Sequence, residues 1–275
     1  MKKNLYILFL LVVSAAILQS CEKKGNPPAV PPVETMLIDF SNFTSSTKSV
    51  ATFESLSNPK AVPNYNWSVA ATVAGVWNRL FYDNFSVPVE ALRKAIENKP
   101  SYLANKKWQW KYSVNVLSVT YVARFTGQIT SKDVKWEMYI SRSGAGGFAE
   151  FLWFSGTTAL DGKSGQWILN ESKDSQVPML QIDWLKTATE VSSVKYTYVK
   201  SGNPMKNSYI EYGHTTTSLD AFYTIHLYDE SRGTFVDLNI EWSTTGHNGR
   251  IQATAYFSDN NWYCWDGNGN DIQCS

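Results

Sequence analysis

The feature that most constrains the fold is a strict alternation of apolar and polar residues from residue 107 onward. Residues 107–116 read KWQWKYSVNV, in which every second side chain is large and apolar. The same alternation occurs at 133–140, 236–242 and 250–257. Successive side chains of a β-strand point to opposite faces, so this pattern indicates strands with one buried face and one face in water. Such strands are typical of an antiparallel sheet.

Turn-forming residues divide this region into many short strands. Glycine, asparagine, aspartate and proline gather at 144–147, 161–163, 202–204 and 246–249. We expect about ten or eleven strands, mostly joined as consecutive hairpins. A sheet of that size curls or splits in two. The sequence therefore predicts a mainly β (α+β) fold with a large curved antiparallel meander sheet, forming a barrel or half-barrel, and a β-sandwich is the alternative.

The region before the sheet carries helical signals. Apolar residues recur at helical spacing over about 67–83, which predicts an amphipathic helix. Ser86 is a suitable N-cap and Pro88 suits a first helical turn, so we expect a second helix that ends near residue 98. The segment MLIDF at 36–40 indicates a short strand. Two N-terminal helices packed on a curved sheet would be similar in outline to the periplasmic lipoprotein-carrier fold.

The N-terminus reads as an export signal with a lipid-attachment motif. Two lysines precede an apolar stretch at 5–18, which is shorter than the roughly 20 residues of a membrane-spanning helix. The stretch ends in Leu18-Gln19-Ser20-Cys21, which resembles the lipobox of bacterial lipoproteins. This resemblance implies removal of a signal peptide over 1–20 and lipidation of Cys21. A plain signal peptide or an uncleaved anchor is the alternative.

The same resemblance implies a location, and the residues that follow Cys21 indicate the domain layout. A lipidated chain would be anchored in the bacterial cell envelope, at the outer membrane, on its periplasmic face or at the cell surface. Residues 22–33 hold four prolines, and such a stretch favours extended polyproline geometry. We therefore expect a tether over 21–33 and a single β-rich domain over 34–275, with a helical part at about 67–98 and an antiparallel β part at about 107–275.

The two remaining cysteines lie near the C-terminus. Cys264 and Cys274 flank a turn sequence, and a hairpin would place their sulfurs opposite each other. In an oxidising compartment this arrangement favours a disulfide. Within the turn, Asp266 begins a spacing that is typical of a calcium loop, but the sixth position is not glycine and the acidic twelfth ligand is missing. The sequence therefore predicts an ordinary turn.

Other patterns give weak support to catalysis. The three histidines, His214, His226 and His247, lie far apart, and no ligand spacing predicts a metal or cofactor. Asp237 and Glu241 share one face of a strand at about 13 Å, too far apart for a glycosidase pair. A catalytic pair formed with a carboxylate from another strand, such as Glu137 or Glu150, remains an alternative. The near-neutral charge and the lack of a basic run argue against nucleic-acid binding.

The aromatic residues carry the functional hypotheses. Large rings on the alternating strands can form a core or line a cavity for an apolar or amphipathic ligand such as a lipid, glycan or peptide. A non-catalytic binding lipoprotein is the favoured hypothesis. A structural or interaction component of an envelope complex is the alternative, and a glycan hydrolase is the least favoured. The candidate ligand-binding residues are Trp108, Trp110, Trp136, Trp153 and Trp242.

Overall fold

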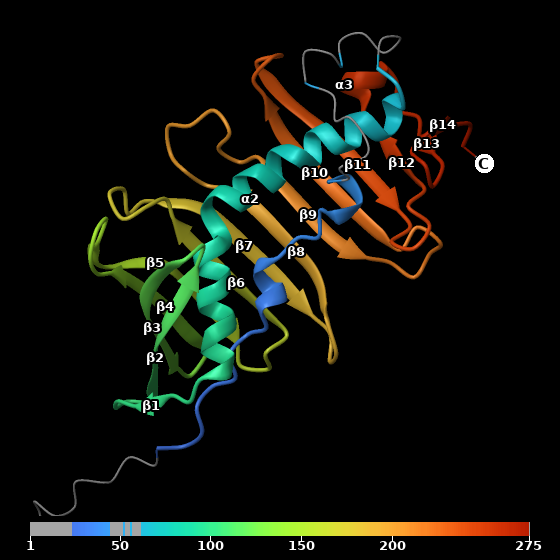
Figure 1. The fold of residues 1–275 in the computed structure, drawn as a ribbon. Helices are drawn as coiled ribbons and strands as arrows, with labels where there is room; N and C mark the ends of the chain where they lie inside the picture. The colour runs from blue at the N-terminus through green and yellow to red at the C-terminus, as the bar shows by residue number, and fades with distance from the viewer. Residues whose placement is uncertain (1–23, 45–51, 53–55, 57–61, 275) are drawn as a thin grey trace, which may run out of the picture.

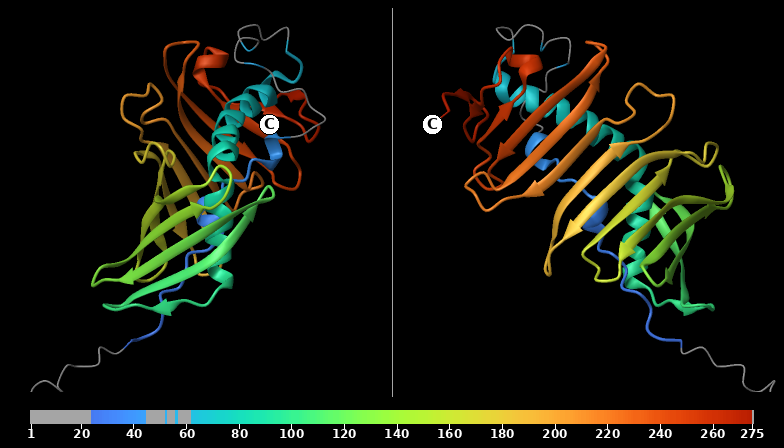
Figure 2. Two further views of the ribbon diagram at one scale, coloured as in Figure 1. Left: turned by 60° about the vertical axis from the view of Figure 1, so that its left-hand side comes forward. Right: turned by 180° about the vertical axis from the view of Figure 1, so that it is seen from behind.

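The computed structural model describes residues 24–44, 52, 56 and 62–274. In these residues the strands form one antiparallel sheet that is not closed into a barrel, and each strand pairs with its neighbours in the sequence (Figure 1). The sheet curves around the helix α2, as the two further views show (Figure 2). The predicted curved meander sheet is therefore confirmed in its open form. The alternative of two packed sheets is wrong, because all fourteen described strands belong to one sheet.

The sheet has more strands than the ten or eleven predicted. The additional strands are mostly short ones at the two edges of the sheet, where β1 and β14 have two residues each. Such short edges offer little backbone for another chain to pair with. In chain order the strands are β1 (Ser101–Tyr102), β2 (Lys107–Val116), β3 (Val119–Ile129), β4 (Asp133–Arg142), β5 (Phe148–Ala159), β6 (Ser164–Asn170), β7 (Pro178–Lys186), β8 (Val191–Tyr198), β9 (Tyr209–His214), β10 (Ala221–Asp229), β11 (Thr234–Trp242), β12 (Gly249–Gln252), β13 (Tyr263–Trp265) and β14 (Asp271–Ile272).

Tryptophan and glycine alternate across the concave face of the sheet. Trp108, Gly127, Trp136, Gly156 and Trp167 stand opposite one another on the neighbouring strands β2 to β6. The rings lie so close to the glycines that a Cβ on Gly127 would be 2.4 Å from the Trp136 ring, and one on Gly156 would be 2.3 Å from the Trp167 ring. Large and small residues must alternate where the inward side chains of a curled sheet converge.

Two more pairs repeat this contact elsewhere in the sheet. Trp184 lies over Gly165, and Trp265 lies over Gly249, each directly opposite its glycine. A glycine in a strand interior permits such close approach. The contact between tryptophan and glycine therefore recurs from β3 to β13, along the curved sheet.

One long helix, α2 (Tyr65–Glu97), lies along the concave face. The two helices predicted over 67–83 and 86–98 are parts of this single helix, so the predicted break at Ser86 is wrong. Pro88 lies inside α2 and cannot donate to the carbonyl of Asn84, and the helix bends part-way along its length (Figure 1). Burial of Phe85 and Leu92 on either side outweighs the cost of the missing hydrogen bond.

The C-terminal hairpin supplies the N-terminal cap of α2. The backbone N–H groups of Tyr65 and Asn66 donate to the two carboxylate oxygens of Asp271 at 3.0 and 2.9 Å. Cys264 and Cys274 form a disulfide across this hairpin, which confirms the predicted pairing. A carboxylate at a helix N-terminus satisfies free N–H groups and interacts favourably with the helix dipole.

Two predicted strands take other forms. The predicted strand at 250–257 stops at Gln252, and residues 254–257 form the short helix α3 (Thr254–Phe257). This turn buries Tyr256, whose hydroxyl donates to Asp229 at 3.2 Å. The segment at 36–40 is not a strand in the described sheet. Its alternation instead buries Met36, Ile38 and Phe40 against the sheet.

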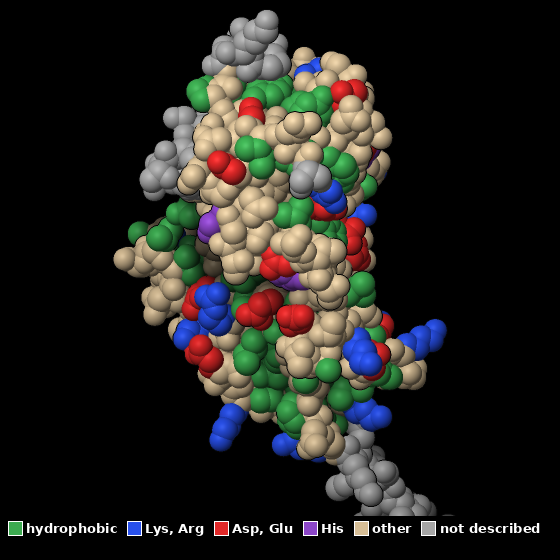
Figure 3. Space-filling model, turned by 90° about the vertical axis from the view of Figure 1, so that its right-hand side faces the viewer, with side chains coloured by type: hydrophobic (Ala, Val, Ile, Leu, Met, Phe, Trp, Pro, Cys, Tyr) green, Lys and Arg blue, Asp and Glu red, His purple; other side chains and the backbone are tan. Residues whose placement is uncertain are grey.

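Charged side chains are unevenly distributed over the surface. In the space-filling view of Figure 3 they are frequent in the middle and lower parts of the face and sparse in the upper part. Lysine and arginine are concentrated toward the lower end. By comparison with Figure 1, this lower end carries β1 and the C-terminus of α2.

The tryptophan–glycine contact leads to a prediction about stability. Gly156→Ala would place a Cβ 2.3 Å from the Trp167 ring and 2.4 Å from the Gln166 carbonyl oxygen. We expect it to lower the free energy of unfolding by about 1–3 kcal/mol, measured by urea denaturation. Gly75→Ala is the control, because a Cβ at Gly75 would meet no atom within 4 Å apart from the adjacent residues and backbone of α2 itself, and it should raise stability by up to about 1 kcal/mol. Equal stability of the two variants would contradict this account of the sheet.

Candidate functional site

An N-terminal strap crosses the concave face beside α2. We use this name for residues 32–43, which include the short 3-10 helices η1 (Val33–Met36) and η2 (Ser41–Phe43). The strap runs between α2 and the strands of the sheet (Figure 1). Part of the segment predicted to be a tether also packs on the domain, since Pro28 and Pro31 are buried. The chain itself therefore fills much of the concave face.

Aromatic side chains of the sheet hold the strap by hydrogen bonds. The indole N–H of Trp167 on β6 donates to the Thr35 hydroxyl oxygen at 3.0 Å, and that hydroxyl donates to the Pro32 carbonyl at 2.7 Å. The Tyr196 hydroxyl on β8 donates to the Met36 carbonyl at 2.6 Å. These bonds satisfy polar groups that would otherwise be buried without a partner.

A third strand contributes the same kind of bond further along the strap. The Tyr223 hydroxyl on β10 donates to the carbonyl of Asp39. Burial raises the pKa of Tyr196 and of Tyr223 well above the usual value. Both hydroxyls, which are protonated at neutral pH in any tyrosine, therefore remain hydrogen-bond donors into alkaline solution as well.

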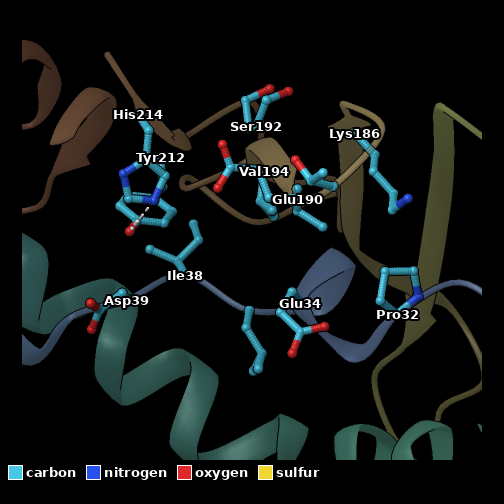
Figure 4. Close-up of a pocket in the computed structure, with 14 residues that line it drawn as sticks. Pro32, Glu34, Ile38, Asp39, Lys186, Glu190, Ser192, Val194, Tyr212 and His214 are labelled. Atoms are coloured by element: carbon cyan, nitrogen blue, oxygen red, sulfur yellow. Dashed lines mark hydrogen bonds between the residues drawn. The ribbon is translucent and has the colours of Figure 1, made fainter. Parts of the chain in front are cut away.

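A hollow of about 630 Å³ lies between the strap and β7 to β9. Figure 4 shows the strap residues on one side and residues of β8 and the β7–β8 turn on the other. Apolar atoms line much of it, from Leu37 and Ile38 of the strap and from Val191, Val194 and Tyr212 of the sheet. A volume of this size is in the range of small-molecule binding sites.

The rim of the hollow is mostly acidic. Glu34 and Asp39 of the strap and Glu190 of the β7–β8 turn line it, and all three side chains are exposed. Lys186 at the end of β7 is the basic residue of the lining. The hollow therefore combines an apolar wall with hydrogen-bond acceptors at its edge.

Tyr212 and His214 form the end of the hollow that is contributed by β9. The Tyr212 hydroxyl and His214 Nε2 share a hydrogen bond of 2.9 Å. Burial raises the pKa of Tyr212, and the carboxylates of Asp39 and Asp220 act in the same direction. Hydrogen bonds from the backbone and hydroxyl of Thr244 lower the pKa of Asp220, which therefore stays charged at neutral pH.

The structure places the predicted ligand-binding tryptophans mainly in the core. Four of them are buried and pack against other side chains, and none of the five lines the hollow beside the strap. Trp136 also contributes to the wall of a smaller hollow of about 300 Å³. Trp153 is half-buried at an irregular point in β5. The four buried residues are Trp108, Trp110, Trp136 and Trp242.

The carboxylates considered for catalysis each contact a basic side chain instead of a second carboxylate. The hydrogen bonds from Arg124 lower the pKa of Glu150, so this carboxylate is charged at neutral pH. Within the described chain, no cluster of three or more His, Cys, Asp or Glu side chains is placed to hold a metal ion. The pairs are Glu137 with Lys107 at 3.0 Å, Glu150 with Arg124 at 2.6 Å, Asp237 with His226 at 2.7 Å, and Glu241 with Arg250 at 2.7 Å.

The Asp266 carboxylate of the calcium-like turn accepts hydrogen bonds from residues of the same turn. Its carboxylate accepts hydrogen bonds from the backbone N–H groups of Asn268 and Asn270, each at 2.9 Å, and from the Asn270 side chain at 3.0 Å. These bonds are typical of a turn closed by an aspartate side chain. The geometry is that of the ordinary turn that the sequence predicts.

Cys21 and the predicted signal peptide lie outside the described residues. None of the helices within residues 24–44 and 62–274 combines the length and apolarity needed to cross a bilayer. No protein-family model, curated protein or solved structure matches this chain. The site must therefore be interpreted from its own geometry.

Sequence reasoning did not find the hollow, although part of its signal is present. Tyr212 and His214 are two residues apart in a strand, which places them on one face. Leu37 and Asp39 are the alternate residues of the MLIDF segment. The strap brings Leu37 and Asp39 to Tyr212 and His214 because it crosses strands that lie more than 100 residues further along the chain. No local pattern predicts that path.

The hydrogen bonds to the strap lead to a second prediction. Tyr196→Phe removes the donor to the Met36 carbonyl in a buried position. We expect the free energy of unfolding to fall by about 1–3 kcal/mol, measured by urea denaturation. Tyr82→Phe is the matched control, since the Tyr82 side chain is 70% exposed, and it should change stability by less than about 0.5 kcal/mol. A loss as large in the control would show that the hydroxyl of Tyr196 is not the cause.

Proposed function

We propose that this chain is a lipid-anchored lipoprotein of the bacterial envelope that binds an amphipathic ligand in the hollow between the strap and β7 to β9. The observation that carries the proposal is the 630 Å³ hollow itself, with its apolar wall and carboxylate rim. The lipobox at Leu18 to Cys21 supports the anchored location. The ligand-binding role needs no catalytic group, so it agrees with the paired state of the four carboxylates considered above.

The chemistry of the rim narrows the ligand class. The Asp39 carboxylate already accepts a hydrogen bond from the Ser41 backbone N–H at 2.8 Å. A ligand rich in N–H or O–H donors would satisfy the other two carboxylates, Glu34 and Glu190. A fatty acid or an anionic lipid would meet repulsion from the same groups. Among lipid, glycan and peptide ligands, the rim therefore favours a glycan or a peptide, with its apolar part against Leu37, Val191 and Tyr212.

A second candidate function rests on the outer face of the sheet. Tyr209, His226 and Phe235 form a row of stacked rings across β9 to β11, with centroids 5.5 and 4.5 Å apart. Lys195 lies over the Tyr209 ring at 3.8 Å, and the Phe235 side chain is exposed. A flat aromatic surface suits contact with another protein. This row supports the alternative role as an interaction component of an envelope complex.

The binding proposal predicts a ligand that survives purification. Native mass spectrometry of the wild-type chain should show an added mass that is released on denaturation. Removing two rim charges in Glu34→Gln/Glu190→Gln should weaken binding by roughly tenfold or more, because charged acceptors contribute strongly to hydrogen bonding. The added mass should then be reduced or lost.

The control for this experiment removes a carboxylate elsewhere. Glu230→Gln alters an exposed acidic residue in the turn after β10, which does not line the hollow beside the strap. It should retain the added mass. A wild-type chain with no added mass, and no change in melting temperature with glycan or peptide libraries, would contradict the binding proposal.

The anchored location has its own test. Cys21→Ser should abolish incorporation of labelled palmitate in a bacterial host and leave the signal peptide attached, which intact mass would reveal. Ser20→Ala keeps a small residue before the cysteine and should be processed and labelled normally. Acylation of the Cys21→Ser variant, or a wild-type chain without acyl groups, would show that the lipobox is not used.

A further inference from the structure

The N-terminal end of the described chain lies at one end of the sheet. The Lys24 ammonium lies 5.0 Å from the centre of the Trp108 ring and 6.0 Å from that of Tyr102, at the start of β2 and in β1. Further along, Pro28 lies beside Gly127 near the end of β3. The segment before the strap therefore runs along the end of the sheet at which β2 begins.

The proposed lipid anchor must lie close to this end. Cys21 precedes Lys24 by three residues, which can span at most about 11 Å. If Cys21 carries acyl chains, the headgroups of the membrane are within about that distance of Lys24. The Debye length is roughly 8 Å at physiological salt, so charges at this end experience the membrane surface.

Alternate turns of the meander lie at the same end. Strands β2, β4 and β6 begin there and β3 and β5 end there, because neighbouring strands are antiparallel. The turns at 103–106, 130–132 and 160–163 therefore share this end. Residues 96–100, which are the last two residues of α2 and its link to β1, lie beside β1 at the same end (Figure 1). We call these four segments the anchor-proximal end.

The anchor-proximal end carries exposed lysines that make no ion pair with another described residue. They are Lys99, Lys106, Lys132 and Lys163, accompanied by two exposed carboxylates, Asp161 and Glu97, of which Glu97 pairs with Lys94 at 2.7 Å. Lysine and arginine are also concentrated in the lower part of Figure 3. At the opposite end of the strands, Lys173 and Lys200 pair with Asp174 and Glu171, and Lys206 is the exposed lysine there without an ion pair to another described residue.

Exposed apolar side chains stand among these lysines. Ile96, Leu103 and Leu160 are 50%, 49% and 56% exposed. Apolar side chains beside lysines are typical of protein surfaces that lie in the membrane interface, where the apolar groups enter the acyl boundary and the ammonium groups remain at the phosphates. The two observations point to the same partner.

We propose that the anchor-proximal end docks on the headgroup layer of a membrane that contains anionic phospholipid. This inference rests on the proposed lipid anchor and adds a second, electrostatic contact with the same membrane. Docking would fix the orientation of the domain, with β1 to β6 toward the bilayer and β10 to β14 away from it. The hollow beside the strap lies on β7 to β9, between these two parts of the sheet.

The test uses the processed, lipidated chain in two kinds of vesicle, phosphatidylcholine alone and phosphatidylcholine with phosphatidylglycerol. Hydrogen–deuterium exchange reports on the turns at 103–106, 130–132 and 160–163, and flotation reports on anchoring. We expect several-fold slower exchange of these turns on the anionic vesicles only, and loss of this protection at high salt.

Variants separate docking from anchoring. Lys106→Gln/Lys132→Gln/Lys163→Gln should lose the protection and still float with both kinds of vesicle. The control Lys173→Gln/Lys200→Gln/Lys206→Gln removes the same charge from turns at the opposite end and should keep the protection. These paired results would support the docking.

Three other outcomes would overturn it. A wild-type chain that floats without protection of the three turns has an anchor but no docking. Equal protection of the three turns on neutral and anionic vesicles would show that the anchor alone holds them near the membrane, without recognition of charge. A chain that floats with neither vesicle would overturn the anchor and the docking together.

Discussion

The contact between an indole ring and the glycine opposite it is the constraint on which the rest of this structure depends. Five strands, β2 to β6, share one row in which Trp108, Trp136 and Trp167 alternate with glycine. Without a Cβ on the small residue, the rings of Trp136 and Trp167 can lie against the neighbouring backbone, and the sheet can curl without crowding its inner face. The curl creates a concavity too wide for the sheet's own side chains. α2 and the strap occupy it, and the hollow remains where the strap does not reach β8 and β9 fully.

Aromatic residues on the inner face of the sheet also satisfy polar groups of the strap. A segment without regular pairing, such as the strap, brings backbone groups into the core, and each unpaired group would be costly. Trp167, Tyr196 and Tyr223 present an apolar body to the sheet and one polar atom to the strap. Burial raises the pKa of Tyr196 and Tyr223 further, so these donors persist into alkaline solution. The strap is thus fixed in place, and with it the carboxylates that it contributes to the rim of the hollow.

Local patterns predicted the elements better than their assembly. Period-two alternation identified the sheet and its buried face, and the turn between Cys264 and Cys274 identified the disulfide. The continuity of α2 was missed because burial on both sides of Pro88 outweighs a local preference for a break. The tryptophans were correctly placed on the inner face, but sequence could not show that α2 and the strap would cover them. The hollow depends on contacts between segments distant in sequence, which alternation and turn signals do not encode.

The carboxylate of Asp271 has a consequence for the order in which the molecule assembles. The first N–H groups of α2 find their acceptor only in the final hairpin, about 200 residues further along the chain. A polypeptide that emerges N-terminus first therefore lacks this cap, whose loss costs a helix about 0.5–2 kcal/mol, until the C-terminal hairpin is available.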